Sequence, residues 1–317
     1  MKIVIPDDYQ DMIHRLEAFK LLDGHEVTRY RTPARDLDEL VARLKDAEIV
    51  VEIRERIHFS RALIERLPNL RLIALVGRAS QAIDYTAAAE HQVLVSTGIS
   101  GSPEAPAELA IALMLASRRN IVVEAPRMRA GEWPATLSHR LRGSTLGVFG
   151  LGRIGRLVAE AGRGLGMNVL VWGRENSLAE ARAAGYDTAA SQAELFERAD
   201  VLQLLVRLTP DTRGIVTAAD FARMKQTALF VNVARAELIE KGALVAALER
   251  GRPGFAAVDV YDEEPVTGGN HPLLKMPNVI CTPHLGWAEW DTFELYFREC
   301  FEQIVNYAEG RPLRLAG

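Results

Sequence analysis

Short strand-like runs alternate with amphipathic segments along the first hundred residues, a pattern typical of an α/β domain. The runs predict strands at residues 2–5, 25–31, 48–53, 71–76 and 93–97. Helical spacing between them predicts helices at residues 10–22, 36–47, 60–68 and 84–90. Because most of the strands are almost continuously apolar, they indicate a parallel sheet covered by helices on its faces.

The same alternation restarts after residue 144 and predicts a second, larger α/β unit. Its expected strands are residues 145–150, 168–173, 200–206, 228–233, 254–260 and 278–283. Between the two sets, Pro103 to Arg129 contains no glycine and is apolar nearly all round, which predicts one long, largely buried helix at an interface. Residues 288–308 have helical spacing with no strand after them, so we expect this helix to return to the first unit.

Composition narrows the class of protein without naming a function. The 317 residues suit two domains, and 48% hydrophobic with 25% charged residues is ordinary globular usage. A net charge of −4 is too balanced for a protein that binds nucleic acid or membranes by bulk charge. No apolar run approaches the roughly 18 residues that span a bilayer, and the acidic start does not resemble a signal peptide. The two cysteines and the histidines show no metal-ligand spacing, so we expect no metal ion. A pair of thiols fits a reducing compartment, so we expect a cytoplasmic protein.

A glycine-rich turn joins the first strand and first helix of the second set. In the sequence GLGRIG, Gly150, Gly152 and Gly155 follow the apolar run TLGVF and open a helical segment. A strand, a tight turn and a helix in this order direct backbone N–H groups at a pyrophosphate. The first glycine permits the turn, the second lets the phosphates approach, and the third lets the helix pack closely. The alternative is an ordinary glycine-rich connection, but the flanking elements favour dinucleotide binding.

The end of the next strand bears on which dinucleotide binds. An acidic residue is expected there to bind the adenosine ribose 2′-OH, but the chain has Gly173 followed by Arg174. Without the carboxylate a 2′-phosphate is not repelled, and a guanidinium can bind it through two hydrogen bonds. This predicts NADP(H) or dual specificity. In the alternative interpretation Arg174 is a solvated surface residue, and Glu175 or the backbone holds the ribose of NAD.

Three polar residues lie just beyond the ends of later predicted strands: Arg235, Glu264 and His284. Ligands bind at the carboxyl ends of strands in an open parallel sheet. Arginine can clamp a carboxylate, and histidine can exchange a proton near neutral pH when a neighbouring carboxylate orients it. The combination suits hydride transfer at a carbon next to a carboxylate.

These motifs resemble the D-isomer-specific 2-hydroxyacid dehydrogenases, a family that includes phosphoglycerate, glyoxylate/hydroxypyruvate and D-lactate dehydrogenases. The resemblance covers essentially the whole chain. It rests on GLGRIG, LTPDTRGIV (208–216), NVARAELI, AAVDVYDEEP (256–265) and NVICTPHLG (278–286). It implies a catalytic triad of Arg235, Glu264 and His284.

The resemblance also implies two doubly wound parallel-sheet α/β domains. One is a Rossmann cofactor domain at residues 101–285, and the other is a smaller, flavodoxin-like substrate domain made of residues 1–100 and 286–317. Asp259 would face the nicotinamide carboxamide. Arg235 and His284 would also contact the cofactor, and further contacts implied by the family are Arg153, Ile154, Thr209, Val233, Ala234 and Gly286.

The first domain is expected to supply the substrate-carboxylate site. Backbone N–H groups around Ala79 and Ser80 would hold the carboxylate, and Arg54 matches a position that often points into the family's cleft. Arg54 could equally be a surface residue beside Glu52 and Glu55. Trp287 would shape the substrate pocket with Trp290, unless both only pack the domain interface.

The leading functional hypothesis is therefore an NAD(P)-dependent oxidoreductase acting on CH–OH donors. It would interconvert a D-2-hydroxyacid and its 2-ketoacid, working as a glyoxylate/hydroxypyruvate-type reductase. We expect a homodimer with a small-molecule substrate and no nucleic-acid or membrane partner. The alternatives are a dinucleotide-sensing, corepressor-like binding protein and a phosphite-type dehydrogenase. Three residues depart from the common family pattern: Arg207, Trp287 and Gly173. The first two bear on the identity of the substrate, and Gly173 bears on the cofactor.

Overall fold

The computed structural model describes residues 1–78 and 80–316, which form two units. Unit 1 combines Met1–Ser102 with Glu289–Gly317, and unit 2 is Pro103–Ala288. The divisions expected after residues 100 and 285 lie instead after 102 and 288. They lie directly before Pro103 and Glu289, the N-cap residues of helices α4 (Glu104–Arg118) and α11 (Trp290–Ala308).

Unit 1 contains a parallel five-stranded sheet in the order β2-β1-β3-β4-β5, the flavodoxin-like arrangement. Its strands are β1 (Lys2–Ile5), β2 (Glu26–Arg29), β3 (Ile49–Ile53), β4 (Leu72–Val76) and β5 (Leu94–Ser96). Every residue of the central strands β3 and β4 is buried, as a strand covered on both faces requires.

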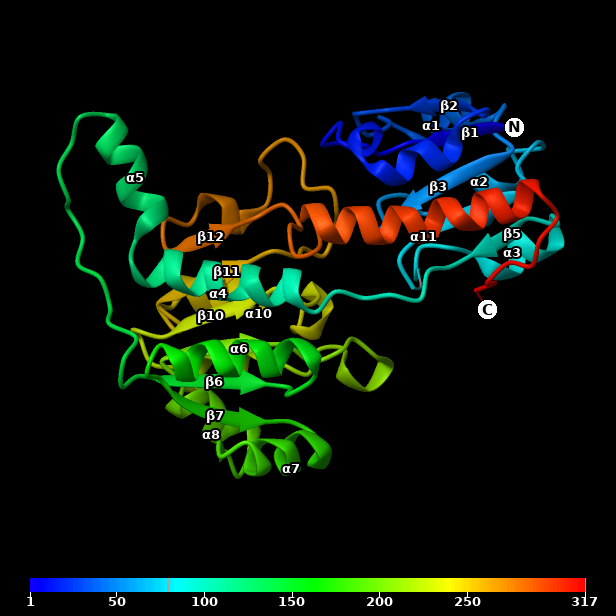
Figure 1. Cartoon of the computed structure of the whole chain (residues 1–317). Coiled ribbons are helices and arrows are strands. Elements are labelled where there is room, and N and C mark those ends of the chain that lie inside the picture. Colours follow the sequence, from blue (N-terminus) through cyan, green and yellow to red (C-terminus); the bar gives the residue numbers. More distant parts are fainter. Residues whose placement is uncertain (79, 317) are drawn as a thin grey trace. The chain divides into compact units, whose positions relative to one another are not determined.

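The helices of unit 1 are α1 (Leu37–Leu44), α2 (Arg61–Ile64), α3 (Tyr85–Glu90) and the C-terminal α11 (Trp290–Ala308). Asp36 caps α1 by accepting the N–H of Glu39. The helix α11 packs on β4 and on the short 3₁₀ helix η2 (Glu17–Leu22) (Figure 1). The α-helix expected at residues 10–22 is wrong: Leu16 is extended, with ψ 141°, and separates η1 (Ile13–Arg15) from η2.

Unit 2 contains a seven-stranded parallel sheet in the order β12-β11-β10-β9-β6-β7-β8. The strands are β6 (Thr145–Phe149), β7 (Asn168–Trp172), β8 (Asp187–Thr188), β9 (Val201–Leu204), β10 (Leu229–Asn232), β11 (Phe255–Val258) and β12 (Val279–Cys281). The sequence predicted all but β8, whose two polar residues form no apolar run. The fold class of two doubly wound parallel-sheet domains is confirmed.

Helices cover both faces of this sheet. One face holds α4 (Glu104–Arg118), α6 (Arg153–Gly164) and α7 (Glu175–Ala183). The other holds α8 (Gln192–Arg198), α9 (Ala218–Arg223) and α10 (Ala243–Glu249). Short 3₁₀ helices complete the unit at η3 (Pro210–Thr212), η4 (Ala236–Leu238) and η5 (Pro272–Lys275). In the part of the chain that the structure describes, no helix is both long and apolar enough to cross a membrane.

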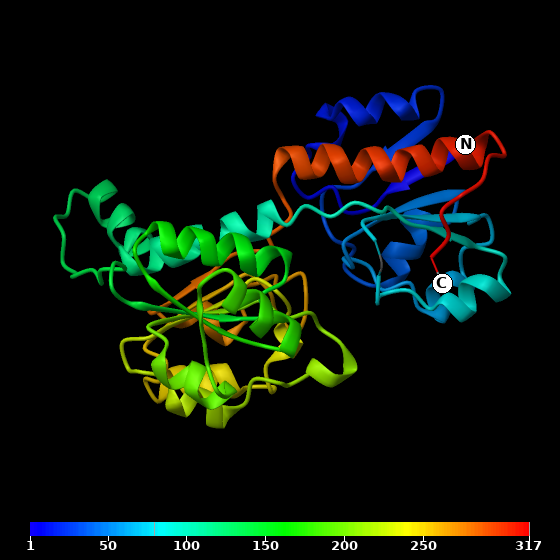
Figure 2. The ribbon, with the colours of Figure 1, turned by 60° about the horizontal axis from the view of Figure 1, so that its bottom comes forward.

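The single long helix expected from Pro103 to Arg129 is broken into two. Asn120 adopts a left-handed conformation, with φ 53°, between α4 and α5 (Ile121–Arg129). Because α5 has no buried residue, the expectation of a largely buried helix is also wrong for this half. We call residues 121–140 the arm. Figures 1 and 2 show α5 and the chain after it standing away from the sheet of unit 2.

Candidate active site

The strand order of unit 2 places a ligand crevice at the carboxyl ends of β6 and β9. The chain runs from β6 outward to β8 and then returns to β9 on the other side of β6, so the order reverses there. Helices on either side of such a reversal leave a crevice in which ligands bind. Gly150 directly follows β6, and Thr209 lies in the segment after β9. Both are residues that the sequence assigned to the cofactor.

The glycine-rich turn has the backbone geometry that its residue types permit. Gly150 has φ +98°, and its N–H donates to the carbonyl oxygen of Trp172 at 2.8 Å. A Cβ at Gly155 would lie 2.2 Å from the carbonyl oxygen of Gly150, so α6 crosses the turn where no side chain fits. Gly152 caps α6, and Arg153 and Ile154 form its first turn. This cradle fits a pyrophosphate.

The residues expected to determine the preference for NAD or NADP lie at the end of β7. A Cβ at Gly173 would lie 3.1 Å from the Cβ of Ser177, so the position suits a small residue. Arg174 is exposed at the start of α7. Glu175 carries the nearest carboxylate, and that carboxylate forms an ion pair with Arg182 at 3.3 Å.

Arg235, Glu264 and His284 follow three adjacent parallel strands, β10, β11 and β12. His284 Nδ1 and Glu264 Oε2 are 2.5 Å apart, and both side chains are partly exposed. Arg235 donates through Nη1 to the carbonyl oxygen of Ala234 at 2.7 Å. The structure thus joins the histidine and the carboxylate directly and places the arginine on the next strand.

The environment of Glu264 keeps it ionised. Burial raises the pKa of this carboxyl, whereas the hydrogen bond and charge of His284 lower it. The N–H of Tyr261, which donates to Glu264 Oε1 at 2.9 Å, and the charge of Arg235 act in the same direction. The pKa of Glu264 is therefore lowered below its ordinary value, and the carboxylate places a negative charge 2.5 Å from Nδ1 of His284.

Asp259 holds the turn that carries His284. Its fully buried carboxylate accepts the Thr282 hydroxyl at 2.6 Å and the N–H groups of Leu285 at 2.7 Å and Gly286 at 2.8 Å. Burial raises the pKa of Asp259 despite these donors. The turn needs such support because His284 has φ 51°, a left-handed conformation that non-glycine residues seldom adopt. The sequence singled out Asp259, but not this use of its oxygens.

Asn232, at the end of β10, is a supporting residue that the sequence analysis missed. Its side chain donates to the carbonyl oxygen of Arg235 and accepts the N–H of Ala234, both at 2.9 Å. It thereby fixes the Val233–Ala234 segment assigned to the cofactor. The sequence feature that could have identified Asn232 is a polar residue at the end of an otherwise apolar, buried strand. Thr209 is held in a similar way, since its N–H donates to the hydroxyl of Thr212 at 2.8 Å.

Comparison with known proteins agrees with this geometry. The family model described as "D-isomer specific 2-hydroxyacid dehydrogenase, NAD binding domain" matches residues 111–286. The D-3-phosphoglycerate dehydrogenase of Methanocaldococcus jannaschii is 38% identical over 98% of this chain and 58% of its own length. Glyoxylate/hydroxypyruvate reductase B of Salmonella newport is 32% identical over 97% of this chain and 93% of its own. The chain belongs to the D-isomer specific 2-hydroxyacid dehydrogenase family.

A solved structure of this family extends the likeness to three dimensions. Phosphoglycerate oxidoreductase from Vibrio cholerae O395 is 45% identical, with a TM-score of 0.94 over 98% of this chain and 99% of its own. Unit 2 includes all of the residues matched to the family's NAD-binding domain. The chain spans little more than half the length of the archaeal phosphoglycerate dehydrogenases it matches, 58% of one and 53% of another.

The residues expected to bind substrate are divided between the units. Arg54 and Ser80 belong to unit 1, where Ser80 is buried and Arg54 is half-buried. Ala79 lies outside the described residues. Trp287 is buried in unit 2, whereas Trp290 is exposed at the start of α11.

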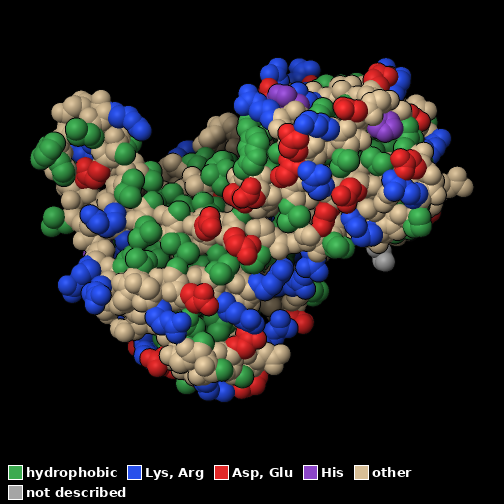
Figure 3. Space-filling model, viewed as in Figure 1, with side chains coloured by type: hydrophobic (Ala, Val, Ile, Leu, Met, Phe, Trp, Pro, Cys, Tyr) green, Lys and Arg blue, Asp and Glu red, His purple; other side chains and the backbone are tan. Residues whose placement is uncertain are grey.

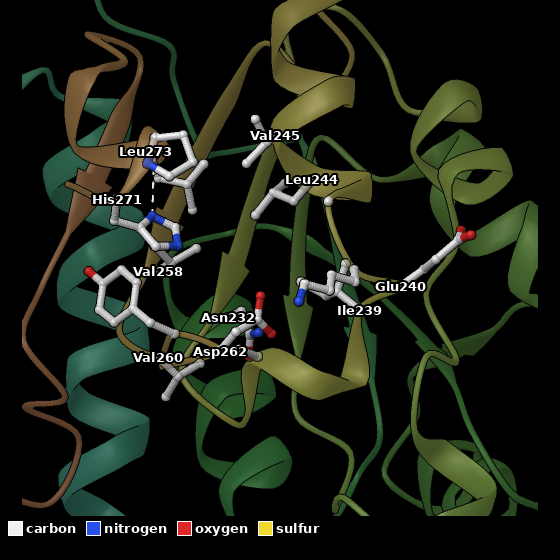
Figure 4. Close-up of a pocket in the computed structure, with 15 residues that line it drawn as sticks. Asn232, Ile239, Glu240, Leu244, Val245, Val258, Val260, Asp262, His271 and Leu273 are labelled. Carbon is white, nitrogen blue, oxygen red and sulfur yellow. Dashed lines mark hydrogen bonds between the residues drawn. The ribbon is translucent and has the colours of Figure 1, made fainter. Parts of the chain in front are cut away.

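A cavity of about 260 Å³ lies beside the strand ends of β10 and β11 (Figure 4). Its wall is largely aliphatic, with Leu244, Val245 and Val258 among its residues. His271 Nδ1 accepts the N–H of Leu273 at 3.3 Å, and its ring stacks edge-on to Tyr261 at 5.1 Å. Arg235, Glu264 and His284 do not line this cavity, but Asn232 and Tyr261, which hydrogen-bond to Arg235 and Glu264, do.

Proposed function

We propose that the protein is an NAD(P)-dependent oxidoreductase that interconverts a D-2-hydroxyacid and its 2-ketoacid. The observation that carries this proposal is the 2.5 Å contact between His284 and Glu264, with Arg235 just beyond the end of the adjoining strand β10 in the same NAD-binding domain. Family membership supports the reaction class.

In this proposal each of the three residues has a separate task. The bound dinucleotide supplies or accepts the hydride. Because Nδ1 of His284 is engaged by Glu264, Nε2 is left to donate a proton to the carbonyl oxygen during reduction and to take it back during oxidation. Glu264 holds the imidazole in this orientation and favours its protonated form. Arg235 binds the substrate carboxylate through its planar guanidinium.

Unit 1 would supply the second part of the carboxylate site. Backbone N–H groups around Ala79 and Ser80 and the guanidinium of Arg54 are the proposed contacts. Thr97 supports this loop, since its hydroxyl donates to the carbonyl oxygens of Gly77 at 3.1 Å and Arg78 at 2.6 Å. Trp287 is also proposed to shape the substrate pocket.

We propose that the cofactor is NADP(H), or that both dinucleotides are used. The support is the pair Gly173–Arg174 at the end of β7, where glycine occupies the position expected for a ribose-binding carboxylate and an exposed arginine follows it. The proposed family contacts Arg153, Ile154, Thr209, Val233, Ala234, Asp259 and Gly286 complete the dinucleotide site.

The proposed direction is reduction of a small 2-ketoacid of the glyoxylate or hydroxypyruvate type. The relative named glyoxylate/hydroxypyruvate reductase B, matched over 93% of its own length, supports this proposal, and the phosphoglycerate oxidoreductase of Vibrio cholerae O395, matched over 99% of its own, makes 3-phosphohydroxypyruvate the competing substrate to test. We further propose a homodimer formed through the arm.

The deciding experiment follows NADH and NADPH consumption with glyoxylate, hydroxypyruvate, pyruvate, bulkier 2-ketoacids and 3-phosphohydroxypyruvate. Reduction of the small 2-ketoacids supports the proposal. Preference for 3-phosphohydroxypyruvate would replace the substrate assignment but keep the reaction. Cofactor binding with no turnover of any 2-ketoacid would favour a dinucleotide-sensing protein, and phosphite-dependent reduction of NAD⁺ would favour the phosphite-type enzyme.

A further inference from the structure

Strand β3 of unit 1 ends with a buried carboxylate. Glu52 is 2% exposed and lies in a strand whose five residues are all buried. A buried charged group is unfavourable unless nearby groups compensate for it. The surroundings of Glu52 therefore indicate what this side chain does.

The first partner of Glu52 is the turn that follows β3. Arg54 and Glu55 both adopt left-handed conformations, with φ 53° and 65°. Two such non-glycine residues in succession persist only where their surroundings hold them. Glu52 Oε1 accepts the N–H of Glu55 and so closes the turn. Glu55 Oε1 in turn accepts the N–H of Gln81 at 2.7 Å, which ties the turn to the loop after β4.

The turn presents Arg54 to that same loop. The guanidinium lies over the ring of Tyr296, 5.9 Å from its centroid. A Cβ at Gly77 would come within 2.8 Å of Arg54 Nη1, so the guanidinium lies against a backbone position without a side chain. Glu52 and Glu55 therefore hold together Arg54 and the loop of residues 77–81, the two features proposed above to bind the substrate carboxylate.

Charged and titratable groups face Glu52 from several elements. Glu55 and Asp7 are acidic, Arg54 and Arg56 are basic, and Tyr85 and Cys300 are also near enough for its charge to act on them. Burial raises the pKa of Glu52 to about 7, with Glu55 and Asp7 adding to the rise and the Glu55 N–H and Arg54 opposing it. The side chain therefore changes charge in the neutral range.

We propose that Glu52 is a positioning residue that controls how tightly unit 1 holds an anionic substrate. Its carboxyl oxygen fixes the Arg54–Glu55 turn in either protonation state. Its negative charge, when present, repels the substrate carboxylate and competes for Arg54, so protonation of Glu52 strengthens substrate binding. This inference rests on the proposed function, which places the substrate carboxylate at Arg54 and the 77–81 loop.

The test measures binding of oxamate, an unreactive 2-ketoacid analogue, to the enzyme–NADH complex, or the NADPH complex if that cofactor is preferred. The dissociation constant is determined from about pH 5.5 to about pH 8.5 for the parent protein and for Glu52→Gln. Glutamine can still accept the Glu55 N–H but carries no charge. We expect the ratio of the two constants, parent over variant, to be about one at low pH and to rise several-fold as Glu52 ionises. Because the parent and the variant differ only at residue 52, pH effects from the rest of the protein cancel in the ratio.

Two further variants separate charge from positioning. Glu52→Leu cannot accept the Glu55 N–H, so oxamate binding should weaken at every pH while NADH binding is retained. Glu48→Gln is the matched control, directly before the other end of β3, because it removes a carboxylate that accepts the N–H of Lys2 at 2.8 Å, and it should leave the pH profile unchanged.

Each failure has a distinct meaning. A parent-to-Glu52→Gln ratio that stays constant with pH would overturn the charge role of Glu52. If Glu52→Leu does not fold, the glutamine ratio still decides that point. Oxamate that binds to none of these proteins while NADH or NADPH binds to all of them would overturn the proposed substrate site, and the Glu52 inference with it.

Discussion

Two carboxylates near His284 acquire different properties from their surroundings. Glu264 is partly exposed, and the interactions with His284, Tyr261 and Arg235 lower its pKa although burial raises it. Asp259 is fully buried, and burial raises its pKa although three donors and His284 oppose the rise. The first is suited to act on the imidazole, and the second to hold the loop that carries it.

The Glu264–His284 contact makes a pH-dependent prediction. In the proposed mechanism His284 donates a proton during reduction, so the rate of reduction should fall with rising pH. Glu264, whose pKa is lowered, is ionised throughout the neutral range and favours the imidazolium. Glu264→Gln should therefore move the decline in kcat/KM for reduction to lower pH, measured as a pH–rate profile with a small 2-ketoacid.

His284→Ala is the companion variant. It should lower kcat by on the order of 10²–10⁴-fold while cofactor affinity is retained, the usual effect of losing a positioned acid/base. A Glu264→Gln profile that coincides with that of the parent would show that the two residues are not coupled, and the proposed triad would have to be abandoned.

At the scale of elements, the proposed dinucleotide site depends on the N-termini of the two helices that follow β6 and β7. Helix α6 begins at Arg153 and is capped by Gly152 of the glycine-rich turn, and α7 begins at Glu175, one residue after Arg174. The N-terminus of a helix favours negative charge, because its first N–H groups have no partner within the helix. Both starts are thus suited to phosphate groups.

Gly155→Ala should disrupt dinucleotide binding, because the added Cβ would lie 2.2 Å from the carbonyl oxygen of Gly150 and would push α6 off the turn. We expect at least a tenfold loss of NADH and NADPH affinity, together with a lower melting temperature. Gly164→Ala, later in the same helix, has nothing within 4 Å of the added Cβ and serves as the control. Equal behaviour of the two variants would contradict the close approach at Gly155.

Arg174→Ala tests the choice of cofactor. It should raise KM for NADPH several-fold while leaving KM for NADH nearly unchanged, because only NADPH carries the 2′-phosphate. Arg198→Ala, which removes an exposed arginine of α8 in a surface ion pair with Glu194, controls for a general loss of positive charge. An equal change of KM for both dinucleotides would restore the interpretation of Arg174 as a solvated surface residue.

At the scale of the whole molecule, the arm exposes apolar side chains that a bound partner would cover. Its exposed apolar side chains are Ile121, Val122, Val123, Met128, Trp133 and Leu137. Figure 3 shows hydrophobic side chains gathered on this projecting part of unit 2. An apolar patch of this kind on a projecting element marks an interaction surface, and a second copy of the chain is the partner we propose.

The dimer prediction is tested by sedimentation at micromolar concentration. Trp133 and Leu137 are 79% and 94% exposed, so replacing both by Asp should leave the fold intact and convert a dimer into a monomer. Leu37→Glu, at an exposed apolar position on α1 in unit 1, is the control and should not change the mass. A parent protein that sediments as a monomer would overturn the proposal.

Sequence alone determined the features that depend on local periodicity. Eleven strands were predicted, and each has a counterpart among the twelve of the structure, because an apolar run bounded by turn residues is visible without knowing its neighbours. Two further features are also visible from neighbouring residues in the sequence. They are the strand–glycine–helix order around Gly150 and the positions of Arg235, Glu264 and His284 at strand ends. In a parallel sheet such positions meet at one edge, so the triad could be expected before its distances were known.

Tertiary structure decided whatever depends on distant partners. The two-residue strand β8 exists because it pairs with β7, and the expected long helix is broken at Asn120, which adopts a left-handed conformation. The three donors to Asp259 and the link from Glu52 through Glu55 to Gln81 join residues far apart in the chain. Helical spacing and residue type carry no information about such contacts, because the partners of a buried polar group are chosen by how the elements pack.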